Sequence, residues 1–448
     1  MKRYFCYLPI VVILFTTFSS TGIAHAKGQL IDTSFYSSSL DTTRLVDVYL
    51  PAGYDSDDST RYPVVYYLHG YGRNQNDHQF IIDSLDAWIA NDKIEPIILV
   101  KPDGSAYPFQ DWNPKVGWYA NSELIGRFED YIIHDLVNFI DAQYKTIAVR
   151  DKRCIMGFSM GGTGAMQLAL KHPDIYCAVA SHSGTLDLSW CKVLIGYANS
   201  NEYKTAPPFN YSPNAGFASL ELFSRAAAYS PNLNNPPYFV DFVLDSGGNI
   251  IDSVWARWMS FNPKTLASAL PPESNLHIYF DCGQQDMYGK FNYNVNFSNH
   301  LDSLGIIHMF QCFDGNHEDK IDRRFPISFA FLDSVIQSTA TNIERVEESD
   351  KSISVPKSYV LDQNFPNPFN PVTTIGFELP VNGYVAIDVT DLLGRRIRTI
   401  ISEYRLAGNH KVIWNGRDDA DNPVATGVYL YTMRINGYTG TRKLVLIR

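Results

Sequence analysis

The stretch RCIMGFSMGGTGAMQLALKHP, residues 153–173, joins two sequence periods at a glycine-rich turn. Before Ser159 the chain is short and apolar, as in a buried strand, and after it the apolar residues recur at helical spacing until Pro173. Residues 157–161 read GFSMG, which matches the pattern G-x-S-x-G. The glycines of this pattern allow a strained turn that lifts the serine hydroxyl above the C-terminal edge of a sheet. The context predicts that Ser159 is a nucleophile; the alternative is that the glycines merely let a strand turn into a helix.

Short apolar segments alternate with amphipathic segments on both sides of this turn. The alternation predicts a mainly parallel sheet that is covered by helices on both faces. The expected strands are 63–68, 96–104, 153–156, 177–184, 276–283 and 308–315, and the expected helices are 80–90, 123–144, 163–171 and 291–304.

The amino-acid composition and the hydrophobic pattern change near both ends of the chain. Residues 1–26 carry a basic start, an apolar run and small residues at a cleavage site, which indicates a signal peptide. The alternative is a retained anchor, but the run is short of the roughly 20 apolar residues that a spanning helix needs. We expect residues 27–340 to form the α/β domain, 341–357 a polar linker, and 358–448 a small all-β, immunoglobulin-like sandwich, because short alternating strands and turn signals fill that segment.

Charge and cysteine content exclude several classes of partner. The chain has a formal net charge of −10, and removal of residues 1–26 takes away two cations and no acid. This balance argues against nucleic acid or anionic lipid as the main partner. Six cysteines, five of them beyond the signal peptide, show no paired CxxC spacing, so we expect no zinc site and no cofactor. The odd number leaves the disulfide pairing open.

A serine nucleophile requires an acid and a histidine, which follow it in that order at the ends of later strands. Of the eleven histidines, His317 follows the last expected strand and is the candidate general base. Asp286 lies a few residues past the strand 276–283 and is the candidate acid. Asp281, still on that strand, is the runner-up, and Asp314 leaves too little chain to reach back to His317.

Two backbone N–H groups are expected to bind the oxyanion. One is that of Met160, directly after the nucleophile, and the other is that of Tyr71, in the loop after the strand 63–68. Trp112 and Trp118 follow the strand 96–104 at the edge of the sheet where ligands bind, and they are candidate pocket walls. His182, at the end of the strand after the nucleophile, is a candidate cleft residue.

The segments RLVDVYLPAGYD, RYPVVYYLHGYGRNQNDH, GFSMGGTGAMQLALKHPD, DCGQQD and GNH together resemble the esterase D family of α/β hydrolases over residues ~40–335. This family includes S-formylglutathione hydrolases and feruloyl and acetyl-xylan esterases. The resemblance implies an α/β-hydrolase fold, a triad of Ser159, Asp286 and His317, and an oxyanion hole at Tyr71 and Met160. The chain departs from the formylglutathione hydrolase type because His69 stands where that type has serine.

The segments LDQNFPNPFNPVTTIGFELP and ATGVYLYTMRINGYTGTRKLVLIR are similar to C-terminal sorting domains of the type IX secretion system. This resemblance implies secretion or display at the cell surface, with the secretion machinery as a partner. The alternative is a carbohydrate-binding sandwich in which Trp414 and tyrosines form a stacking face.

The sequence therefore predicts an exported serine esterase that acts on small-molecule or polysaccharide esters. A feruloyl or acetyl ester on plant polysaccharide is the expected substrate, on family analogy and export rather than on any pocket residue. Acyl transfer to a sugar and a non-catalytic carbohydrate-binding protein are the alternatives.

Overall fold

The computed structural model describes residues 27–56, 59–106, 116–202, 216–245, 248–343, 358–380, 383–405, 408–435 and 437–447. The chain divides into two compact units, Met1–Glu347 and Glu348–Arg448. Each unit is described by itself.

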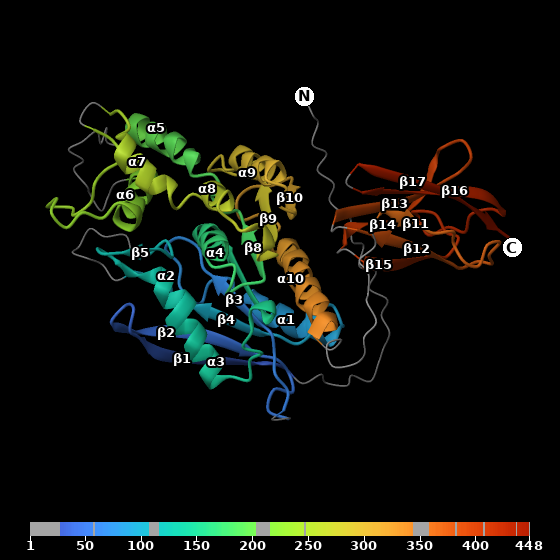
Figure 1. Ribbon diagram of the computed structural model, residues 1–448, viewed down its shortest axis with the longest axis horizontal. Coiled ribbons are helices and arrows are strands. Elements are labelled where there is room, and N and C mark those ends of the chain that lie inside the picture. Colours follow the sequence, from blue (N-terminus) through green and yellow to red (C-terminus); the bar gives the residue numbers. More distant parts are fainter. Residues whose placement is uncertain are drawn as a thin grey trace. The chain divides into compact units, whose positions relative to one another are not determined.

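The first unit is built on an eight-stranded sheet with the strand order β1-β2-β4-β3-β7-β8-β9-β10 (Figure 1). β2 runs antiparallel to both β1 and β4, and every other neighbouring pair is parallel. The predicted α/β class with a mainly parallel sheet is confirmed. The strands are β1 (Gln29–Ser37), β2 (Thr42–Leu50), β3 (Val64–Leu68), β4 (Ile98–Pro102), β7 (Arg153–Phe158), β8 (Ala178–His182), β9 (His277–Gly283) and β10 (His308–Phe313).

The central strands are buried on both faces, which explains why they read as continuous apolar runs. Every residue of β3, β4, β7 and β8 is buried. Helix α4 (Met160–Lys171) packs against β3, β7 and β8, and helix α10 (Ile321–Ile343) packs against β8 and β9. Helices α1 (Phe80–Ala90) and α9 (Phe291–Ser303) form where the sequence pattern predicts helices.

Helix α4 begins three residues before the pattern predicts, directly at Met160. Its first turn contains Gly161 and Gly162, which have low helix propensity and hide the start of the helix in the sequence. Their reason is packing: a Cβ added at Gly161 would lie 1.9 Å from the carbonyl oxygen of Leu68. The helix can therefore approach β3 closely only if this position is glycine.

The helix expected over 123–144 is interrupted. Two-residue strands β5 (Asn121–Ser122) and β6 (Gly126–Arg127) pair first, and α2 (Phe128–Asp130), a π-helical turn over Tyr131–Leu136, and α3 (Val137–Gln143) follow. The sequence pattern did not predict β1, β2 or α10. The strands β1 and β2 lie at the edge of the sheet, and the first residues of β2 alternate between exposed and buried, so their apolar signal is weaker than that of the central strands.

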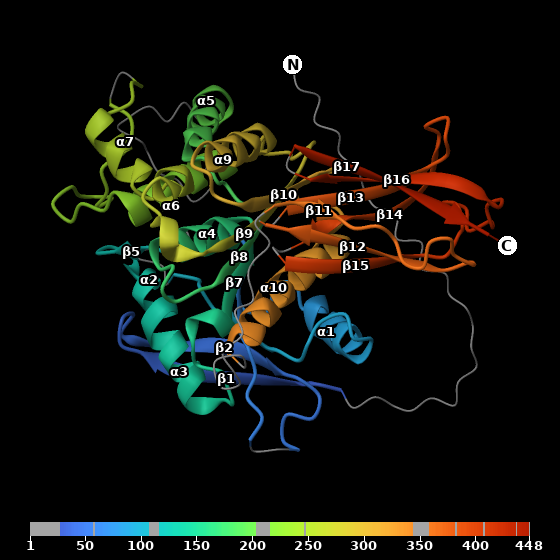
Figure 2. The same ribbon diagram turned by 45° about the vertical axis from the view of Figure 1, so that its right-hand side comes forward.

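The segment between β8 and β9 folds as a group of helices, α5 (Cys191–Asn201), α6 (Phe217–Tyr229), α7 (Asp252–Met259) and α8 (Pro263–Ala267). Figures 1 and 2 both show α5, α6 and α7 together, on the opposite side of α4 from β1 and β2. On α7, Trp258 is 1% exposed and donates from Nε1 to Ser230 Oγ at 2.9 Å. This tryptophan packs the helical group onto the core.

The second unit is an antiparallel β structure of two sheets. One has the order β11-β12-β15 and the other β14-β13-β16-β17. Trp414 lies in the core between them: it is 1% exposed, donates from Nε1 to Arg417 O at 2.9 Å, and contacts the rings of Phe369 and Tyr429. A ring so buried cannot stack on a sugar. The strands are β11 (Val360–Leu361), β12 (Thr373–Leu379), β13 (Gly383–Thr390), β14 (Arg396–Arg405), β15 (Gly408–Trp414), β16 (Gly427–Ile435) and β17 (Tyr438–Leu446).

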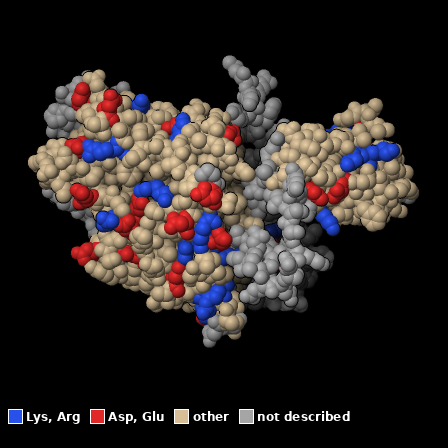
Figure 3. Space-filling view, viewed as in Figure 1, with Lys and Arg blue, Asp and Glu red and all other residues tan. Residues whose placement is uncertain are grey.

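Charged side chains of both signs are interspersed on the face of the first unit that Figure 3 shows. Among the helices of the described residues, none combines the length and the apolar character that crossing a membrane requires.

Candidate active site

Ser159 occupies a strained turn between β7 and α4. Its backbone has φ 54° and ψ −111°, a conformation that a residue with a side chain adopts at a cost. The turn is held because Ser159 N donates to His182 O at 2.8 Å. A Cβ at Gly157 would lie 2.4 Å from the backbone of Gly161, so both glycines of the motif are required for the chain to cross itself here. This strained conformation places Oγ at the edge of the sheet, where a substrate can reach it.

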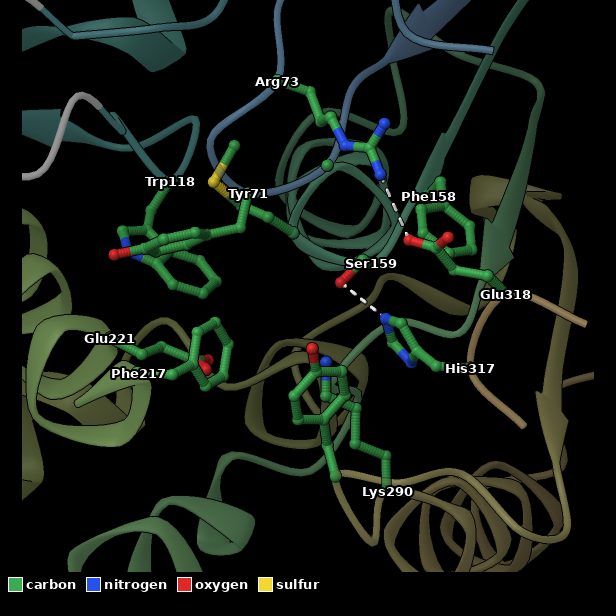
Figure 4. A pocket seen from close by; sticks show the side chains of 13 residues that line it. Tyr71, Arg73, Trp118, Phe158, Ser159, Phe217, Glu221, Lys290, His317 and Glu318 are labelled. Carbon is green, nitrogen blue, oxygen red and sulfur yellow. Dashed lines mark hydrogen bonds and ion pairs between the residues drawn. The ribbon is translucent and has the colours of Figure 1, made fainter. Parts of the chain in front are cut away.

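His317 and Asp286 meet Ser159 from two loops that follow β10 and β9. His317 Nε2 lies 2.9 Å from Ser159 Oγ, and His317 Nδ1 lies 2.6 Å from Asp286 Oδ2. The other oxygen, Asp286 Oδ1, accepts the N–H of Tyr288 at 2.9 Å, which fixes the carboxylate. Figure 4 shows the His317 ring turned toward Ser159. The structure thus brings together the three residues that the sequence analysis selected by their order along the chain.

Burial and neighbouring charges set the protonation of this pair. Burial, followed by the positive charge of Lys290, lowers the pKa of His317 below its ordinary value of 6.5, although Asp286 opposes the shift. Burial alone would raise the pKa of Asp286, but the hydrogen bond from His317 and the charge of Lys290 lower it below its ordinary value. At neutral pH the imidazole is therefore neutral and the carboxylate is ionised, which is the state that a general base and its orienting acid need.

Met160 and Tyr71, whose backbone N–H groups are expected to bind an oxyanion, both line the pocket at Ser159. Met160 is the first residue of α4, so its N–H has no intrahelical acceptor. Tyr71 follows Gly70, whose N–H donates to Asp77 Oδ2 at 3.0 Å. This contact with a buried carboxylate holds the loop after β3 in place.

His69 directly follows strand β3 and has a structural role. Its Nδ1 donates to Gly70 O at 2.9 Å, and its Nε2 accepts the N–H of Gly104 at 2.8 Å. Burial lowers the pKa of His69, so the ring is neutral. The histidine that distinguishes this chain from the formylglutathione hydrolase type therefore connects two loops at the edge of the sheet.

Ser159 opens into a pocket of about 190 Å³ with aromatic and charged walls. Figure 4 shows Trp118, Tyr71 and Phe217 on one side of Ser159, and Arg73 and Glu318 on the other. Arg73 and Glu318 form an ion pair at 3.3 Å. The lining residues are Gly70, Tyr71, Arg73, Trp118, Phe158, Ser159, Met160, Phe217, Glu221, Tyr288, Lys290, His317 and Glu318.

Three of the sequence predictions for this region have different outcomes. Trp118 lines the pocket, whereas Trp112 lies outside the described residues. His182 does not line the pocket and is fully buried, with Nδ1 2.7 Å from Asp281 Oδ2 and Nε2 2.9 Å from Ser328 Oγ. The prediction that His182 is a cleft residue is therefore corrected: the end of β8 turns its side chain under the sheet edge and toward α10.

The runner-up acid, Asp281, is committed elsewhere. Its carboxylate pairs with His182 and with the guanidinium of Arg324, both of which are buried. It does not contact the imidazole of His317.

Sequence reasoning missed several pocket residues. Tyr288 and Lys290 follow Asp286 within four positions, so their place near the site could have been inferred from the acid. Phe217 and Glu221 are four residues apart on α6 and face the pocket together, but nothing in the sequence shows where this helical insertion docks. Among the described residues, no group of three or more His, Cys, Asp or Glu is placed to hold a metal ion.

A mainly parallel sheet with a serine on a strand–helix turn, and with a histidine and an acid on later loops, is the architecture of an α/β hydrolase. The family model named Esterase, described as "Putative esterase", matches residues 37–304, and the chain belongs to this family.

Two curated relatives agree with the family, and a solved structure agrees with the fold. An esterase of Mycobacterium tuberculosis is 35% identical over 158 residues, which cover 34% of this chain and 32% of the relative. An endo-1,4-beta-xylanase/feruloyl esterase of Xylanibacter ruminicola is 32% identical over 158 residues, which cover 33% of this chain and 20% of the relative. The chain thus spans a third or less of the length of these relatives. A solved ferulic acid esterase shares the fold at a TM-score of 0.50 and 18% identity, over 69% of this chain and 99% of that one.

Proposed function

We propose that the protein is a serine carboxylesterase that works through Ser159, His317 and Asp286. The observation that carries the proposal is the chain of contacts at the strained turn, with 2.9 Å from Ser159 Oγ to His317 Nε2 and 2.6 Å from His317 Nδ1 to Asp286 Oδ2. Membership of the Esterase family supports the same reaction class.

Each residue has a role in the proposed reaction. Ser159 Oγ attacks the ester carbonyl carbon and passes its proton to His317 Nε2, while Asp286 stabilises the imidazolium. The N–H groups of Met160 and Tyr71 bind the oxyanion of the tetrahedral intermediate. His317 then gives the proton to the leaving alcohol, and an acyl-enzyme remains on Ser159. Water, deprotonated by His317, attacks the acyl-enzyme, and His317 returns that proton to Ser159 Oγ as the acid is released.

The proposed substrates are feruloyl or acetyl esters on plant polysaccharide. The name of the Xylanibacter ruminicola relative supports a polysaccharide context. The rings of Tyr71, Trp118, Phe217 and Tyr288 in the pocket support an aromatic acyl group, because aromatic side chains pack well on a planar ring.

We also propose that residues 1–26 are a signal peptide and that residues 358–448 direct the protein out of the cell by type IX secretion. The support is the sequence resemblance and the antiparallel β unit that begins near residue 358. Deletion of residues 357–448 is expected to abolish surface delivery and to leave esterase activity intact. Loss of activity in the truncated protein would instead favour a substrate-binding role for the second unit.

The direct test of the function is a panel of feruloylated, acetylated and simple acyl esters, with the released acid identified by chromatography. Free acid from the wild-type protein and none from Ser159→Ala is the expected result. Acyl groups recovered on an added sugar rather than as free acid would make the protein a transferase. No product with any ester would contradict the proposal.

A further inference from the structure

Lys290 is a buried cation in the pocket that the proposed reaction does not use. Its residue is 5% exposed, and the side chain lines the pocket next to Ser159 and His317. Figure 4 shows it reaching up from the loop below toward Ser159. The backbone at this point is fixed, because Lys290 O accepts from the amides of Tyr293 and Asn294 at the start of α9.

The ammonium group of Lys290 rests on aromatic rings rather than on an acid. Its Nζ lies 5.2 Å from the ring centroid of Trp190 and 5.3 Å from that of Tyr288. Among the described residues, no carboxylate forms an ion pair with Nζ, although Asp286 is close enough for the charge of Lys290 to lower its pKa. Cation–π contacts recover part of the hydration that burial removes from an ammonium group, but they satisfy none of its three N–H donors. The pocket therefore holds a strong donor for which the described residues provide no hydrogen-bond acceptor.

The same pocket also contains a hydrogen-bond acceptor. Glu221 is 3% exposed and lines the pocket from α6. Its Oε1 accepts from Arg225 Nη2 at 2.8 Å, and Arg225 is itself stacked on Trp118, 3.7 Å from the ring centroid. The hydrogen bond from Arg225 uses one carboxylate oxygen, and a carboxylate can accept several more.

We propose that Lys290 and Glu221 recognise a hydroxyl group on an aromatic acyl substrate, an inference that rests on the proposed esterase function. A hydroxyl group accepts from an ammonium and donates to a carboxylate at the same time, whereas a carboxylate on the substrate would be repelled by Glu221. The walls of Tyr71, Phe217 and Trp118 fit a planar ring. The volume of about 190 Å³ exceeds the roughly 150 Å³ of a cavity that holds benzene, so a substituted ring has room.

The test compares matched methyl esters of cinnamic acid: unsubstituted, hydroxylated at ring position 2, 3 or 4, and carboxylated on the ring. The wild-type protein is expected to prefer at least one hydroxylated ester over the unsubstituted ester in kcat/KM. Lys290→Met is expected to lower this preference about tenfold or more, as loss of a charge-assisted hydrogen bond does. Lys290→Gln, which keeps a donor, should recover part of it, and Glu221→Gln should lower it less than Lys290→Met does.

Lys192→Met is the matched control. Lys192 also holds its ammonium over a tryptophan, 5.2 Å from the ring centroid of Trp255, but it is exposed and does not line the pocket. This variant should keep the wild-type preference.

Three results would overturn the inference. In the first, Lys290→Met and Lys290→Gln both keep the wild-type preference. In the second, the wild-type protein prefers the carboxylated ester and Lys290→Met loses that preference, so that the cation reads an anion instead. In the third, the wild-type protein hydrolyses none of the esters, which defeats the esterase function itself before any variant is compared. Binding of the free acids to Ser159→Ala, with and without Lys290→Gln, provides a second measurement that does not depend on turnover.

Discussion

The described residues of the first unit include two groups of three side chains in which an aspartate contacts a histidine and the histidine contacts a serine. The corresponding distances in the two groups are nearly equal. In one, His317 lies 2.6 Å from Asp286 and 2.9 Å from Ser159. In the other, His182 lies 2.7 Å from Asp281 and 2.9 Å from Ser328. Distances among three side chains do not distinguish the proposed catalytic site from the second group.

The two serines differ in strain, access and the use of their protons. Ser159 sits at φ 54° on the turn before α4 and opens into the pocket. Ser328 lies inside α10, is fully buried, and is also within 3.0 Å of Phe325 O, so its single proton is shared between the helix and His182. No substrate reaches it. The comparison teaches that an accessible hydroxyl on a strained turn, next to backbone N–H groups that can bind an oxyanion, defines a nucleophile better than the hydrogen-bonded triad does.

The fully buried group supports the one that opens into the pocket. The guanidinium of Arg324 pairs with Asp281 and also donates to His317 O at 3.2 Å. Ser183 Oγ accepts from Arg324 at 2.8 Å and donates to the same carbonyl at 2.9 Å. The backbone of His317 is thus held by two donors that rest on Asp281, and this support orients the imidazole toward Ser159.

The largest expected difference lies between the two serines. Ser159→Ala should lower kcat for p-nitrophenyl acetate by roughly 10⁴- to 10⁶-fold, because it removes the nucleophile. Ser328→Ala should leave kcat within about threefold and instead lower the free energy of unfolding by about 1–3 kcal/mol, since His182 Nε2 loses a buried partner. Steady-state kinetics and urea unfolding of both variants make the comparison. Wild-type turnover in folded Ser159→Ala would remove this serine from the mechanism.

The two aspartates should separate in the same way. Asp286→Asn is expected to lower kcat about 10⁴-fold with little change in folding, because an amide favours the wrong tautomer of His317. Asp281→Asn breaks a buried ion pair and should lower the free energy of unfolding by about 3–5 kcal/mol. Kinetics at a temperature where both variants are folded, together with denaturant titration, distinguish the outcomes. If Asp281→Asn shows the larger loss of kcat while folded, the acid was assigned wrongly.

The sequence predicted the group at the pocket and not the second, fully buried group, for a physical reason. Ser159, Asp286 and His317 follow a fixed order at the ends of successive parallel strands, and strand ends are readable from apolar runs. Arg324 and Ser328 lie on α10, which packs against β8 and β9. The sequence around the G-x-S-x-G motif contains no pattern that predicts where this helix packs. His182 was placed at the correct strand end, but the direction of its side chain depends on the contact with Asp281. The pocket residues on α6 were missed because this helix belongs to an insertion, and the α/β-hydrolase fold does not determine where an inserted helix packs.

The support of His317 offers a smaller effect to measure. Ser183→Ala removes one of the two donors to His317 O and should lower kcat about fivefold, with KM nearly unchanged, as loss of one buried hydrogen bond of about 1 kcal/mol predicts. Ser334→Ala is the control, because Ser334 Oγ donates to a backbone carbonyl, that of Phe331, within α10 and does not contact the His317 loop. An equal loss of kcat in both variants would show that the effect does not come from the support of His317. A change in KM alone would show that Ser183 does not act through the base.

The smallest expected effect is a shift along the pH axis, and it again separates the two histidines. Burial and then Lys290 lower the pKa of His317 below 6.5, and only the neutral ring acts as a base, so the acid limb of kcat/KM should lie below pH 6.5. Lys290→Met removes a positive charge that disfavours protonation, and it should move this limb to higher pH by less than about one unit. Lys192→Met should leave the limb in place, and a limb that stays fixed or moves down in Lys290→Met would contradict the account.

Burial also lowers the pKa of His182. Because the unfolded chain then binds more protons, this contribution to stability is full above about pH 6.5 and is lost as the pH falls. Its titration should therefore appear in unfolding curves and not in the rate profile.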